Sequence, residues 1–184
     1  MGFAGTMAAF TTYQDANRMK LEGSCHCGAV RFTVDSNTPY PFSRCYCSTC
    51  RKLNGGAGYT VNIMAEADTL KVEGEEHLTV YRSKLNDRGR YEADGLGFSR
   101  RHFCRHCGTM LWNFNPNHPD WIYPFATAID TDLPMPPAHR HTMLDYRVSW
   151  AEVPPDGPDE AQYGRYPDDS IEDWHRTRDL YGKH

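Results

Sequence analysis

Seven cysteines lie in three short clusters, and the chain contains no other cysteine. The clusters are Cys-His-Cys at 25–27, Cys-Tyr-Cys-Ser-Thr-Cys at 45–50 and Cys-Arg-His-Cys at 104–107. Cysteines separated by one or two residues can point their sulfurs into one tetrahedral shell, about 2.3 Å from a zinc ion. The spacing therefore predicts metal binding by thiolates.

Other cysteine chemistries fit the pattern less well. Seven cysteines cannot all pair within one chain, and a disulfide between the members of a Cys-x-Cys unit closes a very small, strained ring. An iron–sulfur cluster or a thiol redox relay would also use thiolates at short spacing. Neither of these needs seven cysteines divided in this way.

The sequence allows several divisions of the seven thiolates, and ligand counting favours one of them. The flanking pairs Cys25/Cys27 and Cys104/Cys107 together complete a four-thiolate site, which would be closed and structural. Cys45, Cys47 and Cys50 then leave a fourth position open, as a catalytic zinc requires. The alternative is a histidine that closes the second site. The histidines with suitable chemistry are His26, His102, His106, His139 and His141.

Length and composition predict one globular domain. The chain has 184 residues, 39% of them hydrophobic, with a mean hydropathy of -0.71 and no apolar run near the ~20 residues that a membrane-spanning helix needs. Residues 1–20 lack the basic start and apolar block of a secretory signal, so we expect a cytoplasmic, reducing environment with free thiolates. Residues 1–19 are expected to form a flexible extension, followed by a single domain over 20–184.

Charge argues against nucleic-acid binding, because the formal net charge is -4. One local basic cluster stands out. We interpret it as the solvated flank of the last cysteine cluster. Its members are Arg100, Arg101, His102 and Arg105.

The pattern of short alternating segments predicts a mainly β fold with a short C-terminal helix. Strands are expected at residues 29–34, 59–63, 78–81 and 110–114. Residues 121–126 form another apolar run, which Pro124 should place at an edge or a bulge. A short helical turn is expected at 48–53, and Ser170 with Asp173 predicts a capping box for a helix from 171 to about 180. Proline-rich connections are expected at 133–141 and 153–158.

The three clusters, with the residues around them, resemble the glutathione-dependent formaldehyde-activating enzyme family, which also includes centromere protein V. The matching segments are Gly23 to Val30, Cys45 to Lys52, and Phe103 to Thr109 with Leu111. The resemblance runs from about Lys20 to about Trp150. It implies a β-tent fold of small antiparallel sheets with zinc knuckles. It also implies two zinc ions per chain, with the following ligands: a structural zinc on Cys25, Cys27, Cys104 and Cys107, and a catalytic zinc on Cys45, Cys47 and Cys50.

The activity implied by the resemblance is a carbon–sulfur lyase reaction in the reverse sense, the formation of S-hydroxymethylglutathione from glutathione and formaldehyde. A thiol entering an open zinc position would ionise and then attack the aldehyde carbon. Arg51 or Lys52 could bind a glutathione carboxylate or assist the developing alkoxide, although both could simply charge the exposed face of a short helix. Tyr46 departs from the family, which commonly has histidine at this position. The alternative function is a non-catalytic double-zinc module that binds a protein or chromatin, with a saturated second site.

Overall fold

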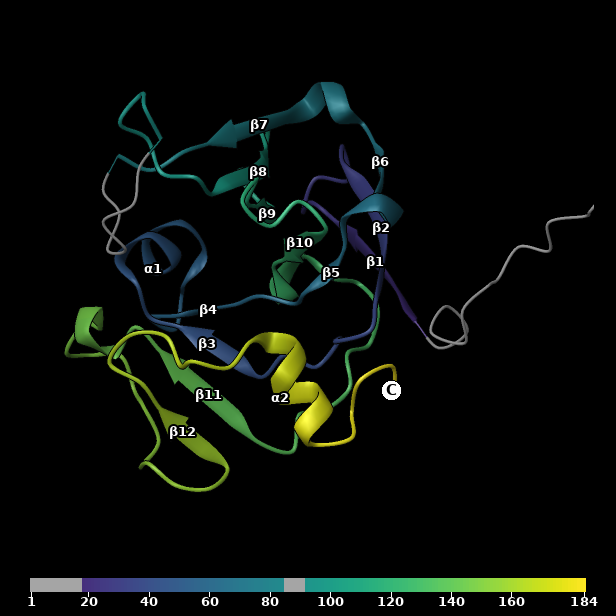
Figure 1. The fold of residues 1–184 in the computed structure, drawn as a ribbon. Coiled ribbons are helices and arrows are strands. Elements are labelled where there is room, and N and C mark those ends of the chain that lie inside the picture. Colours follow the sequence, from purple (N-terminus) through teal and green to yellow (C-terminus); the bar gives the residue numbers. More distant parts are fainter. Residues whose placement is uncertain (1–17, 85–91) are drawn as a thin grey trace, which may run out of the picture.

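The computed structural model describes residues 18–84 and 92–184 (Figure 1). These residues form three small sheets and two short α-helices, which confirms the mainly β prediction. Most of the expected N-terminal extension lies outside the described residues. The first strand already begins at Met19, one residue before the expected start of the domain.

The first sheet is antiparallel, in the order β1 (Met19–Ser24), β2 (Arg31–Ser36) and β6 (Lys71–Glu73). The strand expected at 29–34 begins two residues later. The Cys25 amide donates to the Val30 carbonyl, so the residues before Arg31 complete the turn from β1. Gly28 in this turn has φ +73°, a conformation that glycine adopts without a Cβ clash. The first cysteine cluster thus lies at the tip of a β-hairpin.

The second sheet has five antiparallel strands and holds the third cysteine cluster between two of them. Its order is β5 (Ala65–Glu66), β10 (Trp121–Pro124), β9 (Met110–Phe114), β8 (Arg100–Cys104) and β7 (Leu78–Tyr81). The strands expected at 78–81 and 110–114 are confirmed. The edge or bulge expected for the run around Pro124 is wrong, because β10 lies between β5 and β9 and pairs with both without a register shift. Pro124 has no backbone N–H to donate to a neighbouring strand. This costs no hydrogen bond to β5, because β5 pairs only with Trp121 and Ile122 of β10 and ends before it reaches Pro124.

The third sheet is mixed, with the order β12 (Glu160–Gln162), β11 (His139–Thr142), β3 (Ser43–Cys45) and β4 (Thr60–Val61). β11 runs parallel to both β12 and β3, whereas β3 and β4 are antiparallel. The other two sheets are the small antiparallel sheets that the resemblance implies, and this third sheet adds two parallel pairs. The strand β4 is shorter than the expected 59–63, and β11 occupies the end of the expected proline-rich connection.

Two helices flank the third sheet. The first helix, α1 (Ser48–Asn54), lies close to the expected turn at 48–53. The second, α2 (Ile171–Thr177), begins with the predicted capping box of Ser170 and Asp173. It ends before the expected residue 180, and Asp179 just beyond it has φ 56°. Four single 3₁₀ turns lie elsewhere in the described chain: Ala67–Thr69, Glu75–His77, Ala126–Ala128 and Leu144–Tyr146.

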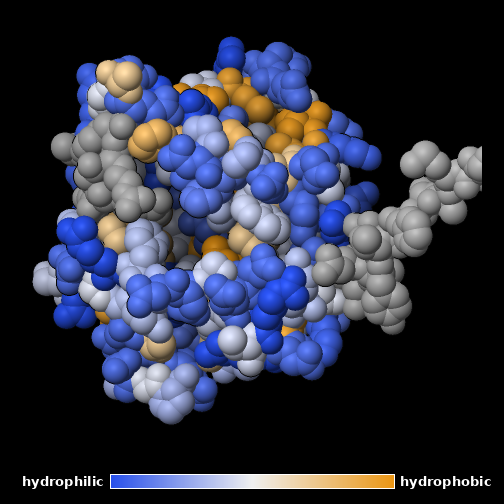
Figure 2. Space-filling view, viewed as in Figure 1, coloured by the Kyte–Doolittle hydropathy of each residue, from blue (hydrophilic) through white to orange (hydrophobic). Residues whose placement is uncertain are grey.

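The main hydrophobic core lies between the first two sheets and includes Leu21, Phe32 and Ile122. A smaller core fixes α2, because the Trp174 ring stacks on Phe42 with their centroids 3.7 Å apart. The surface shown in Figure 2 is mostly hydrophilic and is hollowed near its centre. No helix of the described residues is long and apolar enough to cross a membrane. The two cores hold the three sheets together around the cysteine clusters.

Candidate metal centre

The first and third cysteine clusters meet in one group at the tips of two hairpins. Cys25 and Cys27 lie between β1 and β2, Cys104 ends β8, and Cys107 lies in the turn to β9. Their four Sγ atoms lie within 4.8 Å of one another. Two of these separations are 3.5 Å, from Cys25 to Cys27, and 3.7 Å, from Cys27 to Cys104. A regular tetrahedron of sulfurs around zinc has edges of about 3.8 Å, so this group fits a structural zinc site.

Hydrogen bonds orient the sulfurs of this four-cysteine group. The Val30 amide donates to Cys25 Sγ at 3.2 Å. Thr109 links the two turns, because its Oγ1 lies 3.2 Å from Cys107 Sγ and accepts from the His26 amide at 3.1 Å. The hydrogen bond from Thr109 is the main cause that lowers the pKa of Cys107 to about 5. The hairpin tips therefore favour a thiolate at Cys107.

The central cluster forms a second group at the junction of β3 and α1. Cys45 ends β3, Cys47 is the N-cap of α1, and the Cys50 amide donates to Cys47 Sγ at 3.3 Å. The three Sγ atoms lie within 4.8 Å of one another, and no cysteine of the group is more than 8% exposed. The short helix thus brings three sulfurs together in a buried position.

This three-cysteine group requires a cation if all its sulfurs are to ionise. The adjacent Cys45 sulfur is the largest single cause that raises the pKa of Cys47, to about 11. Cys45, Cys47 and burial all raise the pKa of Cys50. Three soft sulfur donors held this close match the ligand preference of zinc. The group could therefore hold a metal ion with three protein ligands.

Within residues 18–84 and 92–184, no histidine, aspartate or glutamate belongs to either group. Both His139 and His141 bind the Glu160 carboxylate, with N–O distances of 3.0 and 2.6 Å. His102 stacks on Trp112 with centroids 5.0 Å apart. The described residues thus offer no support for the alternative of a histidine ligand, and the open fourth position stays a prediction.

Two cavities border the three-cysteine group. The first, of about 490 Å³, is lined by Cys45 and Cys50, and the second, of about 620 Å³, is lined by Cys47. Both cavities share part of their walls, which come from Arg101, Asn115, His118 and Tyr166. The Tyr166 hydroxyl lies 3.9 Å from Cys45 Sγ. Buried sulfurs are therefore next to space that a small molecule can occupy.

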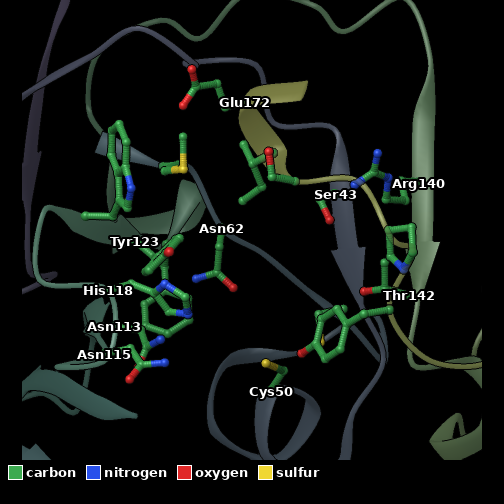
Figure 3. Close-up of a pocket in the computed structure, with 18 of the residues that line it drawn as sticks. Ser43, Cys50, Asn62, Asn113, Asn115, His118, Tyr123, Arg140, Thr142 and Glu172 are labelled. Carbon is green, nitrogen blue, oxygen red and sulfur yellow. The ribbon is translucent and has the colours of Figure 1, made fainter. Parts of the chain in front are cut away.

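Figure 3 shows the first cavity with polar side chains on two facing walls. Cys50 lies near one end. Amide and imidazole groups from β9, the following loop and the segment after β4 form one wall, and hydroxyl and guanidinium groups from the third sheet form the other. The labelled polar residues include Asn62, Asn113, Asn115 and His118 on the first wall, and Ser43, Arg140 and Thr142 on the second.

The sequence-predicted substrate residues lie elsewhere. Arg51 and Lys52 are in the last turn of α1, and neither lines the two cavities. Their role in binding a carboxylate stays a prediction. The interpretation of the basic cluster as a solvated flank is wrong for Arg101, which is only 6% exposed and lines both cavities. Trp150, where the family resemblance ends, is 60% exposed.

Sequence reasoning also missed His118, Tyr166 and the asparagines of the cavity. For Asn113, strand alternation was a signal that could have been used. Arg101 is directly paired with Asn113, and Asn113 with Tyr123, so alternation along these strands places the three side chains on one face. His118 and Tyr166 come from connecting segments without such a signal.

Tyr46, which departs from the family pattern, lies between Cys45 and Cys47 in the chain and lines neither cavity. Its side chain is fully buried, and burial raises its pKa to about 12. The hydroxyl lies 3.0 Å from His141 Nδ1, and the other ring nitrogen of His141 binds Glu160. Burial lowers the pKa of His141, against the opposing effect of the Glu160 hydrogen bond. Tyr46 thereby connects the segment between Cys45 and Cys47 to β11.

Comparisons with known proteins identify the family of this chain. Residues 20–143 match the family described as glutathione-dependent formaldehyde-activating enzyme. A protein of Halomonas elongata whose name assigns it to the same family is 51% identical over 158 residues, covering 85% of this chain and 95% of its own. A Rhodobacter sphaeroides protein of known crystal structure is 29% identical, with a TM-score of 0.46, covering 63% of this chain and 92% of that one. The two cysteine groups could each hold a metal ion through thiolate ligands. The chain belongs to the glutathione-dependent formaldehyde-activating enzyme family.

Proposed function

We propose that this protein is a zinc-dependent carbon–sulfur lyase that forms or cleaves a thiol–aldehyde adduct such as S-hydroxymethylglutathione. The observation that carries the proposal is the position of the three-cysteine group, whose buried sulfurs border two cavities. The name of the Halomonas elongata relative supports glutathione and formaldehyde as the substrates. In this proposal each chain holds two zinc ions, one in each cysteine group.

Cys45, Cys47 and Cys50 would hold the second zinc beside the two cavities that these cysteines line. Zinc bound there would supply a positive charge and a free coordination position that favour ionisation of an incoming thiol. The thiol sulfur then forms a bond to the aldehyde carbon. The electron pair of the carbonyl π bond moves to oxygen, and the proton lost by the thiol is returned to that oxygen. The reverse order of events cleaves the adduct.

Tyr166 is placed to stabilise the oxygen on which charge develops. Its hydroxyl lies 3.9 Å from Cys45 Sγ, and its side chain lines both cavities. A donor fixed in advance stabilises an oxyanion without reorganisation during the reaction. His118, which lines the same two cavities, is the second candidate for moving the proton.

The alternative, a non-catalytic double-zinc module, predicts a second site closed by a fourth protein ligand. Support for the enzyme comes from the described residues, because the second group contains three cysteines and no histidine or carboxylate. A structural site would also have no need of adjoining cavities.

Exchange spectroscopy by NMR tests the proposal directly. Zinc-loaded protein should accelerate exchange between formaldehyde hydrate, glutathione and their adduct above the rate in buffer. Tyr166→Phe should lower this acceleration about a hundredfold. Lys71→Ala, an exposed change on β6, serves as the control and should keep the full rate. Exchange no faster than in buffer would refute the lyase function and leave the binding module as the better account.

A further inference from the structure

Arg101 is a buried cation that no described residue neutralises. Its side chain is only 6% exposed, and within residues 18–84 and 92–184 it has no ion pair, hydrogen bond or ring contact. Burying an unpaired charge is costly, so an arginine in such a position usually has an anionic partner. Arg101 lines both cavities beside the three-cysteine group, and the missing partner can therefore be a ligand.

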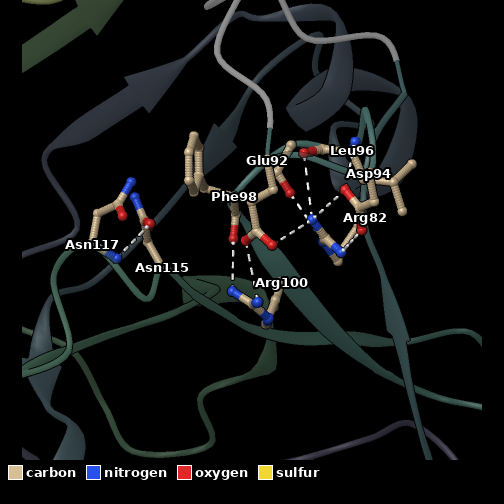
Figure 4. Close-up of polar contacts among 9 residues, drawn as sticks. Arg82, Glu92, Asp94, Leu96, Phe98, Arg100, Asn115 and Asn117 are labelled. Carbon is tan, nitrogen blue, oxygen red and sulfur yellow. Dashed lines mark hydrogen bonds and ion pairs between the residues drawn. The ribbon is translucent and has the colours of Figure 1, made fainter.

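Other arginines in the neighbourhood already have partners. Arg140, which lines the first cavity, is paired with Asp169 and lies over the Phe42 ring. Arg100, the next residue to Arg101 along β8, binds the Glu92 carboxylate at 3.2 Å and the Phe98 carbonyl at 3.3 Å (Figure 4). Successive strand residues point to opposite faces, so these contacts are on the other side of the sheet. Arg101 is thus a buried guanidinium on the wall of both cavities that has no partner among the described residues.

Two amide atoms on the wall of the first cavity also lack partners. Asn113 Oδ1 and Asn62 Nδ2 are buried and have no hydrogen bond within the described part of the chain. Asn113 is directly paired with Arg101 in the sheet and lies on the same face, and Asn62 lines the same cavity. One atom is an acceptor and the other a donor. A peptide group offers the matching N–H and C=O.

We propose that Arg101 binds a carboxylate of the thiol substrate and that Asn62 and Asn113 bind its peptide groups. Arg101, Asn62 and Asn113 would then be the residues that select a peptide-like thiol with a carboxylate over a simple alkyl thiol. A guanidinium can bind both oxygens of a carboxylate, which would fix the orientation of the ligand as well as its position. The inference rests on the proposed function only in taking the ligand of the three-cysteine group to be a thiol.

Calorimetric titration of the zinc-loaded protein with S-methylglutathione and with 2-mercaptoethanol tests this assignment. S-methylglutathione keeps the carboxylates and peptide bonds but has no thiol to ionise, whereas 2-mercaptoethanol has only the thiol and a hydroxyl. Arg101→Met should weaken S-methylglutathione binding about tenfold to a hundredfold. The affinity of the Arg101→Met protein for 2-mercaptoethanol should differ from that of wild type by less than about twofold. Arg101→Lys should recover part of the loss, because it restores the charge without the planar fork.

Arg100→Met is the matched control, since it removes the same charge from the opposite face of β8 and should leave both titrations unchanged. Asn113→Ala should weaken S-methylglutathione and not 2-mercaptoethanol. The wild-type protein supplies an independent measurement, because the dimethyl ester of S-methylglutathione should bind at least about tenfold more weakly than the free acid.

Equal affinity of wild type and Arg101→Met for S-methylglutathione would overturn the assignment, and so would an equal loss for both probes or full binding of the ester. These outcomes are separate from failure of the proposed function. Carboxylate-dependent binding without catalysed adduct exchange would refute the lyase activity and support the Arg101 site. Catalysed exchange that does not depend on Arg101 would support the lyase activity and refute the Arg101 site.

Discussion

Loss of one sulfur from the four-cysteine group should destabilise the fold far more than loss of one sulfur from the three-cysteine group. The first group joins Cys27 and Cys104, which are 77 positions apart, whereas Cys45 and Cys50 are only five apart. If a metal ion in each group is treated as a crosslink of the unfolded chain, the longer loop contributes about 4.5 kcal/mol to the free energy of unfolding and the shorter loop about 2 kcal/mol. A typical domain has about 5–15 kcal/mol of stability in total. Cys104→Ser should therefore unfold much of the protein, and Cys50→Ser should leave it folded.

Urea titrations followed by circular dichroism and tryptophan fluorescence measure the difference. Wild type, Cys104→Ser and Cys50→Ser should be compared with zinc and reductant present, and wild type also with a chelator. The unfolding free energy of the chelated wild type should approach that of Cys104→Ser, since in neither protein does a metal ion join Cys27 to Cys104. Equal losses of unfolding free energy in the two variants would refute the reasoning, because they would mean that both groups stabilise the fold to the same extent.

Three further results are expected. Protein purified with reductant and without chelator should contain close to two zinc ions per chain by elemental analysis, and iron with visible charge-transfer absorption would contradict this. Burial, with the charges of Arg140 and Arg178, lowers the pKa of His175 from its ordinary 6.5 to about 4. Its contribution to stability is therefore complete above pH 6.5 and falls by up to about 3 kcal/mol as the pH drops to 4. Urea midpoints of His175→Phe should decline less over this range than those of wild type, and parallel declines would exclude the effect. Tyr46→Phe leaves His141 Nδ1 without its partner and should cost about 1–3 kcal/mol while zinc content stays unchanged. Loss of zinc would show that Tyr46 also controls the metal group.

The sequence predicted the parts of the structure that local chemistry determines. Cysteine spacing anticipated that the sulfurs within each cluster lie close together, because two hairpin tips and one helical turn each hold their cysteines within a few residues. Ligand counting and the family resemblance, not spacing, joined the first cluster to the third. Strict alternation located β7 and β9, and the Ser170–Asp173 box located the start of α2. These signals depend on neighbours in the chain.

Long-range pairing was beyond the same reasoning. The parallel partners of β11 lie about 20 residues away in β12 and nearly 100 residues away in β3, and short polar strands such as β12 carry no clear alternation. Arg101 was interpreted as solvated because a basic residue is rarely buried without a partner. Its burial becomes understandable only when the cavity between the sheets is known. Tyr166 and α2 lie outside the range matched by the family, so the resemblance could not place them on the cavity wall.

The most direct test of the account is an optical titration of cobalt-substituted protein with glutathione. Cobalt in the three-cysteine group would report entry of a fourth ligand through its ligand-field and charge-transfer bands. The account predicts a saturable spectral change at millimolar glutathione, which Cys50→Ser should abolish and Arg101→Met should shift to higher concentration. Spectra that do not respond to glutathione would contradict an open thiol-binding metal site.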